Sequence, residues 1–345
     1  MALSPSSPPE PLGSVQAVSA AVAGGTIGAA RRGRARQYVE VLREQMAFVL
    51  LFVLVVVASL LSDVFLTPNN VINILYSSAT LGIVALGQTM LLISANFDLA
   101  VASTVSIAGI AALGAYLAGV PLPLAVLAGI GTGVVIGLIN GGLVVRTRAS
   151  PFLITLGMQV LIYALAQIVT HSQQLYTNDT AFTELGRGRL LGVLPWPVVI
   201  FLSLVVITEV VLRLTLFGRY LYALGQNEVA ARLSGISTGT VKLLAFVLCG
   251  GLAGFAGVVL TSRLASTRAG GAAGWEFDSI IAAVLGGTSL FGGVGGTLRT
   301  VVGVLVLGIL NNLLVLINVP YDAQQIVKGG VFLAVVFLDR LVRAR

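Results

Sequence analysis

Charged residues, histidine and cysteine are scarce in this chain of 345 residues. Only 10% of the residues are Asp, Glu, Lys or Arg, whereas a soluble protein typically has about 25%. The single histidine, His171, and the single cysteine, Cys249, exclude an intrachain disulfide and a metal site built from several such ligands. We therefore expect neither a soluble enzyme nor a disulfide-rich secreted domain. We also expect no catalytic residues, no metal and no cofactor.

The chain also lacks a loop for nucleotide phosphates. Its two lysines, Lys242 and Lys328, lie outside any G-x-x-x-x-G-K-[ST] pattern. If the protein uses ATP, a partner ATPase must bind it with Mg and hydrolyse it. The net charge of +7 would suit a nucleic-acid partner, but the basic residues are scattered between apolar runs, so we expect no nucleic acid.

Apolar residues are abundant. They make up 57% of the chain, and the mean hydropathy is +1.01. A membrane-spanning helix needs about 20 mostly apolar residues, and several uncharged runs reach that length. These runs predict an all-α polytopic membrane protein with about ten transmembrane helices. The expected spans are 45–62, 64–97, 99–145 (two spans divided at 119–123), 152–170, 190–208, 243–262, 279–298, 300–321 and 323–338.

The eighth expected span, 279–298, is unusual because glycines crowd its second half. Dense glycine destabilises a continuous helix, so we expect a short or broken helix there. Short sequence matches also suggest an inverted-topology repeat of the kind found in transporters. Phe97-Asp98 precedes the third span and Phe277-Asp278 precedes the eighth, five spans later.

The distribution of basic residues predicts the topology. If the N-terminus is cytoplasmic and there are ten spans, 15 of the 20 Lys and Arg residues fall in cytoplasmic segments, as the positive-inside rule requires. This predicts a multi-pass membrane protein with both termini in the cytoplasm. We expect residues 1–44 to form a disordered basic cytoplasmic tail, and residues 45–342 to form a transmembrane domain with a cytoplasmic loop at 213–242.

One short helix stands out in the 213–242 loop. Asn227 is a good N-cap, and Glu228 and Arg232 form a favourable i, i+4 pair. Gly235 suits the position just after the helix end. Val229 and Leu233 give the helix an apolar side, which predicts either docking of a cytoplasmic partner or packing on the protein's own membrane domain. The full candidate set is Asn227, Glu228, Val229, Ala230, Ala231, Arg232, Leu233 and Gly235.

Residues 228–235 resemble the EAA-type coupling loop of ATP-binding-cassette (ABC) importer permeases. The surrounding sequence is similar to the ribose, xylose and galactose type of sugar permease. The similar stretches keep the same order along the chain and are 87–89, 96–103, 151–157, 217–220, 228–235, 286–290, 311–312 and 324–329. One stretch departs from the family, which usually reads Gly-Ile-Asp-Leu-Ser-Val-Gly-Ser where this chain has Asn96, Phe97, Ala100 and Ala102.

The resemblance implies that 45–342 is the permease domain of a subunit in the bacterial cell (inner) membrane. It implies that this subunit translocates a monosaccharide into the cytoplasm by alternating access. It also implies a second permease copy or paralogue, two ABC ATPase subunits inside and an extracytoplasmic sugar-binding protein outside. Polar residues in the apolar runs are candidates for the substrate pathway, although such side chains more often bond helix to helix. These candidates are Gln88, Asn96, Asp98, Asn140, Asn311, Asn312 and Gln325.

Two other functions remain open. A secondary transporter driven by an ion gradient would suit a broken helix, with Asp98 and Asp278 as the available intramembrane carboxylates. An ABC permease for another cargo, such as branched-chain amino acids or nucleosides, would have the same architecture. Dependence of uptake on ATP separates the first alternative from the importer.

Overall fold

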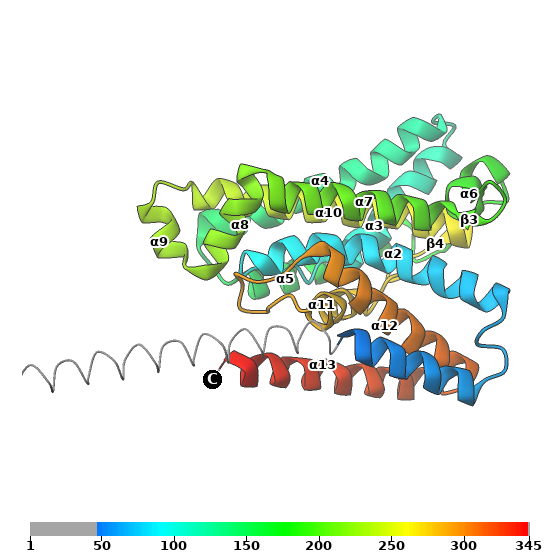
Figure 1. The fold of residues 1–345 in the computed structure, drawn as a ribbon. Helices are drawn as coiled ribbons and strands as arrows, with labels where there is room; N and C mark the ends of the chain where they lie inside the picture. The colour runs from blue at the N-terminus through cyan, green and yellow to red at the C-terminus, as the bar shows by residue number, and fades with distance from the viewer. Residues whose placement is uncertain (1–46, 344–345) are drawn as a thin grey trace, which may run out of the picture. The chain divides into compact units, whose positions relative to one another are not determined.

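The computed structural model describes residues 47–343, so the expected tail at 1–44 lies outside the described residues. The described chain is almost entirely helical (Figure 1). Its helices are Ala47–Leu61, α2 (Pro68–Ile93), α3 (Val101–Leu117), α4 (Leu122–Thr147), α5 (Pro151–Val169), α6 (Thr180–Arg187), α7 (Trp196–Leu214), α8 (Leu216–Gln226), α9 (Glu228–Leu233), α10 (Thr238–Leu264), α11 (Trp275–Leu285), α12 (Thr297–Leu316) and α13 (Tyr321–Arg343).

Within the described residues, six helices are long and apolar enough to cross a membrane. They are α2, α4, α5, α7, α10 and α12. The helices Ala47–Leu61 and α3 are apolar but shorter. These features confirm a polytopic helical membrane protein, while the number of ten spans stays a prediction.

Two expected spans were misplaced. Helix α7 begins and ends six residues later than the expected 190–208, because Trp196-Pro197 starts the helix and Glu209 and Arg213 bond to each other inside its last turns. The eighth span was expected at 279–298 as a short or broken helix. A short helix is confirmed, because α11 (Trp275–Leu285) ends where the glycines begin and α12 starts only at Thr297, but α11 begins four residues earlier than expected. Phe277 and Asp278 therefore lie inside α11, whereas Phe97 and Asp98 precede α3. The two pairs do not hold equivalent positions.

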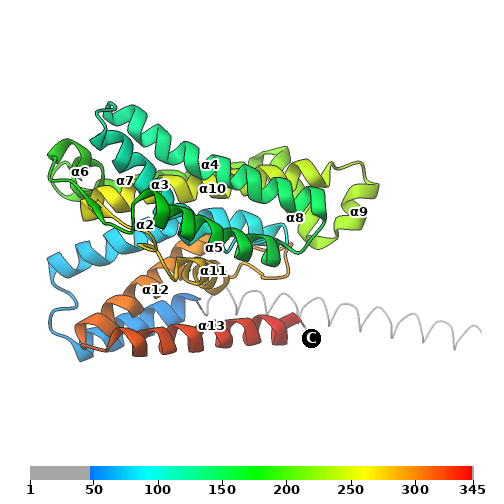
Figure 2. The same ribbon diagram turned by 180° about the vertical axis from the view of Figure 1, so that it is seen from behind.

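Glycines let α4 and α10 pack with their backbones in contact. A Cβ added to Gly133 would overlap the carbonyl oxygen of Gly250, and a Cβ added to Gly250 would overlap that of Gly133. Small residues permit this close approach in a membrane helix pair. The two helices run side by side in both views (Figures 1 and 2). Gly133 and Gly250 thus serve packing within the chain.

Helix α2 is central, since every residue from Ser78 to Ile93 is buried. The small elements gather at two opposite ends of the long helices (Figure 1). One end carries α8 and α9. The other carries α6 and two short antiparallel strand pairs, β1 (Leu175–Tyr176) with β4 (Ser266–Thr267) and β2 (Arg189–Leu190) with β3 (Leu194–Pro195).

Candidate functional site

The short helix α9 forms where the sequence predicts it. The Asn227 side chain accepts a hydrogen bond from the backbone N–H of Ala230 at 2.9 Å and caps the first turn. Gly235 follows the helix end with φ +83°, a left-handed conformation that favours glycine. Both ends of this six-residue helix are therefore specified locally.

A second cation joins the expected ion pair of α9. Arg232 Nη2 lies 3.2 Å from Glu228 Oε1, and Lys242 Nζ, from the first turns of α10, lies 2.7 Å from Glu228 Oε2. Partial burial works to raise the pKa of Glu228, but the hydrogen bond and charge of Lys242, with the charge of Arg232, outweigh it and lower that pKa. The carboxylate thus stays ionised and ties α9 to α10.

The apolar side of α9 faces away from the rest of the chain. Val229 is 68% exposed and Leu233 is 85% exposed, while Ala231 is buried. Val229 and Leu233 stand one helical turn apart and share a face. The helix therefore does not bury this face on its own membrane domain, which was one of the two expectations from the sequence. It offers an apolar contact to another molecule.

Helix α8 comes directly before α9 in the chain, and its last turn contacts the interior of the protein. In this turn Gly225 packs directly on the last turn of α2, and a Cβ there would overlap the carbonyl oxygen of Ile93. The same carbonyl accepts a hydrogen bond from Gly293 N–H at 2.9 Å. The end of α2, the end of α8 and the glycine segment 286–296 thus meet at one junction.

Two more side chains hold the glycine segment against the helices that lead to α9. Tyr222 of α8 donates a hydrogen bond to the carbonyl oxygen of Gly295 at 2.9 Å. Glu209 of α7 accepts hydrogen bonds from the backbone N–H and the hydroxyl of Thr297, and it also pairs with Arg213. A movement of α8 must therefore be shared by α2 and by the start of α12.

Three of the pathway candidates form one buried cluster beyond this junction. Asn140 Nδ2 donates to both carboxylate oxygens of Asp98, at 3.3 and 3.1 Å. Gln88 donates to the Asp98 backbone oxygen at 2.5 Å and accepts from its N–H at 3.2 Å. All three side chains are almost completely buried. Asp98 Oδ1 also accepts the N–H of Ala100 at 2.8 Å, just before α3 begins.

The other four candidates do not join this cluster. Asn312 exchanges two hydrogen bonds with Asn70, at 2.9 and 2.8 Å. Asn70 lies near the start of α2, and Gln88 is 18 positions further on, about 27 Å along the helix axis. Asn96 bonds to Ser94 within its own loop. Asn311 and Gln325 are half-buried on α12 and α13. The seven residues are therefore not gathered in one place, and their part in a substrate pathway stays a prediction.

Side chains of two neighbouring helices form an ion pair and a hydrogen bond with acidic residues of α11. Lys328 Nζ of α13 lies 3.0 Å from Asp278 Oδ2, as expected for a lysine inside a span that needs a carboxylate partner. Gln159 of α5 donates to Glu276 Oε1 at 3.0 Å. Both contacts involve the first turn of α11 and connect it to α5 and to α13.

The sequence alone does not predict some of the contacts in this site. Lys242 is 14 residues from Glu228, and Glu209 is 88 residues from Thr297, so no local spacing reveals either pair. The only signal for Glu209 was its place at the end of an apolar run. Contacts of this kind depend on how the helices pack.

Comparison of the sequence with known proteins shows the family of this chain. Residues 70–336 match the family described as branched-chain amino acid transport system / permease component. The chain is 39% identical over 304 residues to the ribose import permease protein of Escherichia coli (strain K12), which covers 86% of this chain and 94% of that relative. It is 38% identical over 295 residues to the ribose import permease protein of Bacillus subtilis (strain 168), covering 85% and 91%. It is 35% identical over 311 residues to an L-arabinose ABC transporter permease protein of Azospirillum brasilense, covering 90% and 91%.

Proposed function

The chain belongs to the family of branched-chain amino acid transport system / permease components, and on this premise we propose that it is the membrane-spanning subunit of an ABC importer for a monosaccharide. The relatives at 33–39% identity carry names that refer to ribose, allose and L-arabinose. A pentose or similar monosaccharide is therefore the proposed cargo. Branched-chain amino acids, named in the family description, are the rival cargo that an uptake competition assay would reveal.

The exposed apolar face of α9 is the observation that carries the proposal. An importer permease without a P-loop needs a surface through which a separate ATPase acts, and Val229 and Leu233 form an uncovered apolar pair on a locally capped helix. We assign this end to the cytoplasm, in line with the positive-inside distribution. The opposite end, with α6 and the strand pairs, then faces outward.

The contacts between α9 and the core supply a route for the mechanical coupling. The ion pair of Glu228 with Lys242 ties α9 to α10, and Gly225 ties α8 to the end of α2. Closure of the ATPases on α9 would move these elements together and switch the permease between outward-open and inward-open states, as a rigid-body transition does. ATP and Mg are held by the partner, and the present chain contributes no catalytic group.

The assembly we propose contains a second permease copy or a paralogue, two ABC ATPase subunits and an extracytoplasmic sugar-binding protein, in the bacterial inner membrane. Both termini lie in the cytoplasm. The loop with α6, whose N-cap Asp179 accepts the N–H of Ala181 at 2.8 Å, lies on the side where the binding protein docks.

The test places a charge on the apolar face of α9. Leu233→Asp should abolish co-purification of the ATPase and the sugar-stimulated ATP hydrolysis, because a carboxylate would be buried without a partner in the contact. Leu191→Asp is the matched control, since Leu191 is 92% exposed at the opposite end. It should leave the ATPase bound.

Two results would contradict the proposal. ATPase binding that persists in Leu233→Asp would remove α9 as the docking surface. Uptake that survives ATP depletion but collapses with an uncoupler would replace the importer with an ion-driven transporter.

A further inference from the structure

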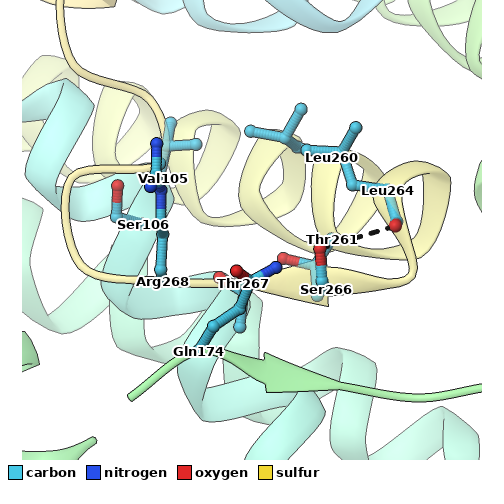
Figure 3. Close-up of a pocket in the computed structure, with 10 residues that line it drawn as sticks. Val105, Ser106, Gln174, Leu260, Thr261, Leu264, Ser266, Thr267 and Arg268 are labelled. Carbon is cyan, nitrogen blue, oxygen red and sulfur yellow. Dashed lines mark hydrogen bonds between the residues drawn. The ribbon is translucent and has the colours of Figure 1, made fainter. Parts of the chain in front are cut away.

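A cavity of about 260 Å³ opens between α3, α10 and the chain around the β1–β4 strand pair (Figure 3). This strand pair lies at the end of the molecule opposite α9 (Figure 1). Sites for drug-sized ligands typically have volumes of about 300–1,000 Å³, so this cavity suits a smaller molecule. Its deep part is formed by the buried residues Thr261 and Thr267, and its mouth by the exposed residues Gln174 and Arg268. None of these belongs to the pathway candidates discussed above.

Four of the six polar side chains that line this cavity are available to a ligand. Throughout residues 47–343, no hydrogen bond or ion pair engages the side chains of Gln174, Thr261, Thr267 or Arg268. The other two are serines with partners: the hydroxyl of Ser106 donates to the carbonyl of Ala102 and accepts the N–H of Ala272, and the hydroxyl of Ser266 donates to the carbonyl of Leu264 (Figure 3). Four side chains with hydrogen-bonding capacity thus line a space of limited size.

Gly109 of α3 packs directly against the two threonines that line the cavity. A Cβ at this position would overlap the Thr261 hydroxyl and would lie 3.1 Å from the Thr267 hydroxyl. Val105, Leu260 and Leu264 supply an apolar wall beside these hydroxyl groups. Hydroxyl and amide groups facing an apolar wall match a sugar ring, which carries hydroxyls at its edge and C–H groups on its faces.

We propose that this cavity is the first binding site of the permease for the monosaccharide, which it receives on the outer side before the switch to the inward-open state. The lining contains no carboxylate and a single cation, Arg268, at the mouth. This composition favours a neutral polyhydroxylated ligand over a cation. The inference rests on the proposed function and adds the place where the sugar binds.

The test uses a cysteine as a reporter in the assembled transporter. Thr267→Cys is close in size to the native residue, and the native thiol of Cys249 is fully buried, so it should not react. A charged, membrane-impermeant thiol reagent is added from outside, with and without D-ribose at high millimolar concentration. We expect the sugar to slow labelling by about threefold or more, as occupancy of about two thirds of the cavity requires.

Leu191→Cys is the matched control, because this exposed outer residue lies outside the cavity and should be labelled at the same rate with or without sugar. A second variant, Thr261→Val, removes one hydroxyl without changing the side-chain shape. We expect it to reduce D-ribose uptake per assembled complex by about twofold to tenfold, as one lost neutral hydrogen bond does.

The outcomes separate this proposal from the function on which it rests. If the wild-type transporter takes up no monosaccharide, the proposed function fails and the sugar site fails with it. If the wild type transports D-ribose but Thr267→Cys is not labelled, or is labelled at a rate that D-ribose does not change, only the site is overturned. Protection by ribose 5-phosphate but not by D-ribose would likewise overturn it, since Arg268 would then select an anion.

Discussion

At the scale of single residues, Asn140 decides whether a carboxylate can remain in the core. Its amide is the one side-chain donor that the described structure gives to the carboxylate of Asp98, at 3.1 and 3.3 Å, and both residues are almost completely buried. Hydrogen bonds to charged groups contribute about 1.5–3 kcal/mol each. We expect Asn140→Leu to lower the free energy of unfolding by about that amount, measured as a lower midpoint of thermal unfolding in detergent.

Asn311→Leu is the control for this prediction. The Asn311 Oδ1 atom is buried without a hydrogen-bond partner among residues 47–343, so its loss leaves no interaction broken and should change the midpoint little. Equal destabilisation by both substitutions would show that the Asn140 effect comes from the added leucine and not from Asp98.

Glu228 gives a second prediction at this scale, based on its lowered pKa. A carboxyl group whose pKa falls on folding contributes stability that is fully present above its ordinary pKa, 4.5 here, and is lost as pH falls through the lower folded value. At cytoplasmic pH the group is fully ionised. Glu228→Gln should therefore reduce sugar-stimulated ATP hydrolysis by the same factor at every pH between about 6 and 8.

The control for Glu228→Gln is the ratio of wild-type to variant rates across this pH range. A ratio that changes severalfold between pH 6 and 8 would mean that Glu228 titrates there, contrary to the lowered pKa. A ratio of one throughout would mean that the ion pair with Lys242 has no role in coupling.

At the scale of elements, the junction of α2, α8 and the glycine segment should couple α9 to the core. A Cβ at Gly225 would overlap the carbonyl oxygen of Ile93, so Gly225→Ala must separate α8 from α2. We expect sugar-stimulated ATP hydrolysis to fall by at least about fivefold, the lower end of typical coupling factors. The ATPase should still co-purify, because α9 itself is unchanged.

Gly142→Ala in α4 is the matched control for the junction, since a Cβ there meets no atom within 4 Å. It should keep wild-type stimulation. Normal stimulation in Gly225→Ala would exclude the junction as the path of coupling, whereas loss of ATPase binding would show that the substitution disturbs α9.

The elements also show how far the sequence predicts this fold. Helix α9 was predicted correctly with both of its ends, because an N-cap, an i, i+4 pair and a terminal glycine are local signals. The start of α7 was missed by six residues, since the apolar run extends over the strand pair β2–β3 that precedes the helix. The contacts of Glu228 with Lys242 and of Glu209 with Thr297 were missed because these partners come from distant segments. Pairing of Asp98 with Asn140 likewise requires the packing of α4 beside the loop before α3.

At the scale of the whole molecule, the orientation in the membrane can be tested with the same labelling chemistry. The positive-inside distribution assigns the α9 end to the cytoplasm and the α6 end to the outside. Leu233→Cys and Leu191→Cys place exposed thiols at these two ends. In right-side-out vesicles, an impermeant maleimide should label Leu191→Cys at once and Leu233→Cys only after the membrane is permeabilised.

The native protein supplies the background for the orientation test, because its single thiol, at Cys249, is completely buried and should remain unlabelled until the chain unfolds. Immediate labelling of Leu233→Cys, with protection of Leu191→Cys, would invert the topology. In that case α9 would face outward and no cytoplasmic ATPase would reach it. The importer would then have to be abandoned even if the fold and the family stand, because ATP-driven coupling requires α9 on the cytoplasmic side and the cavity on the outer side of the membrane.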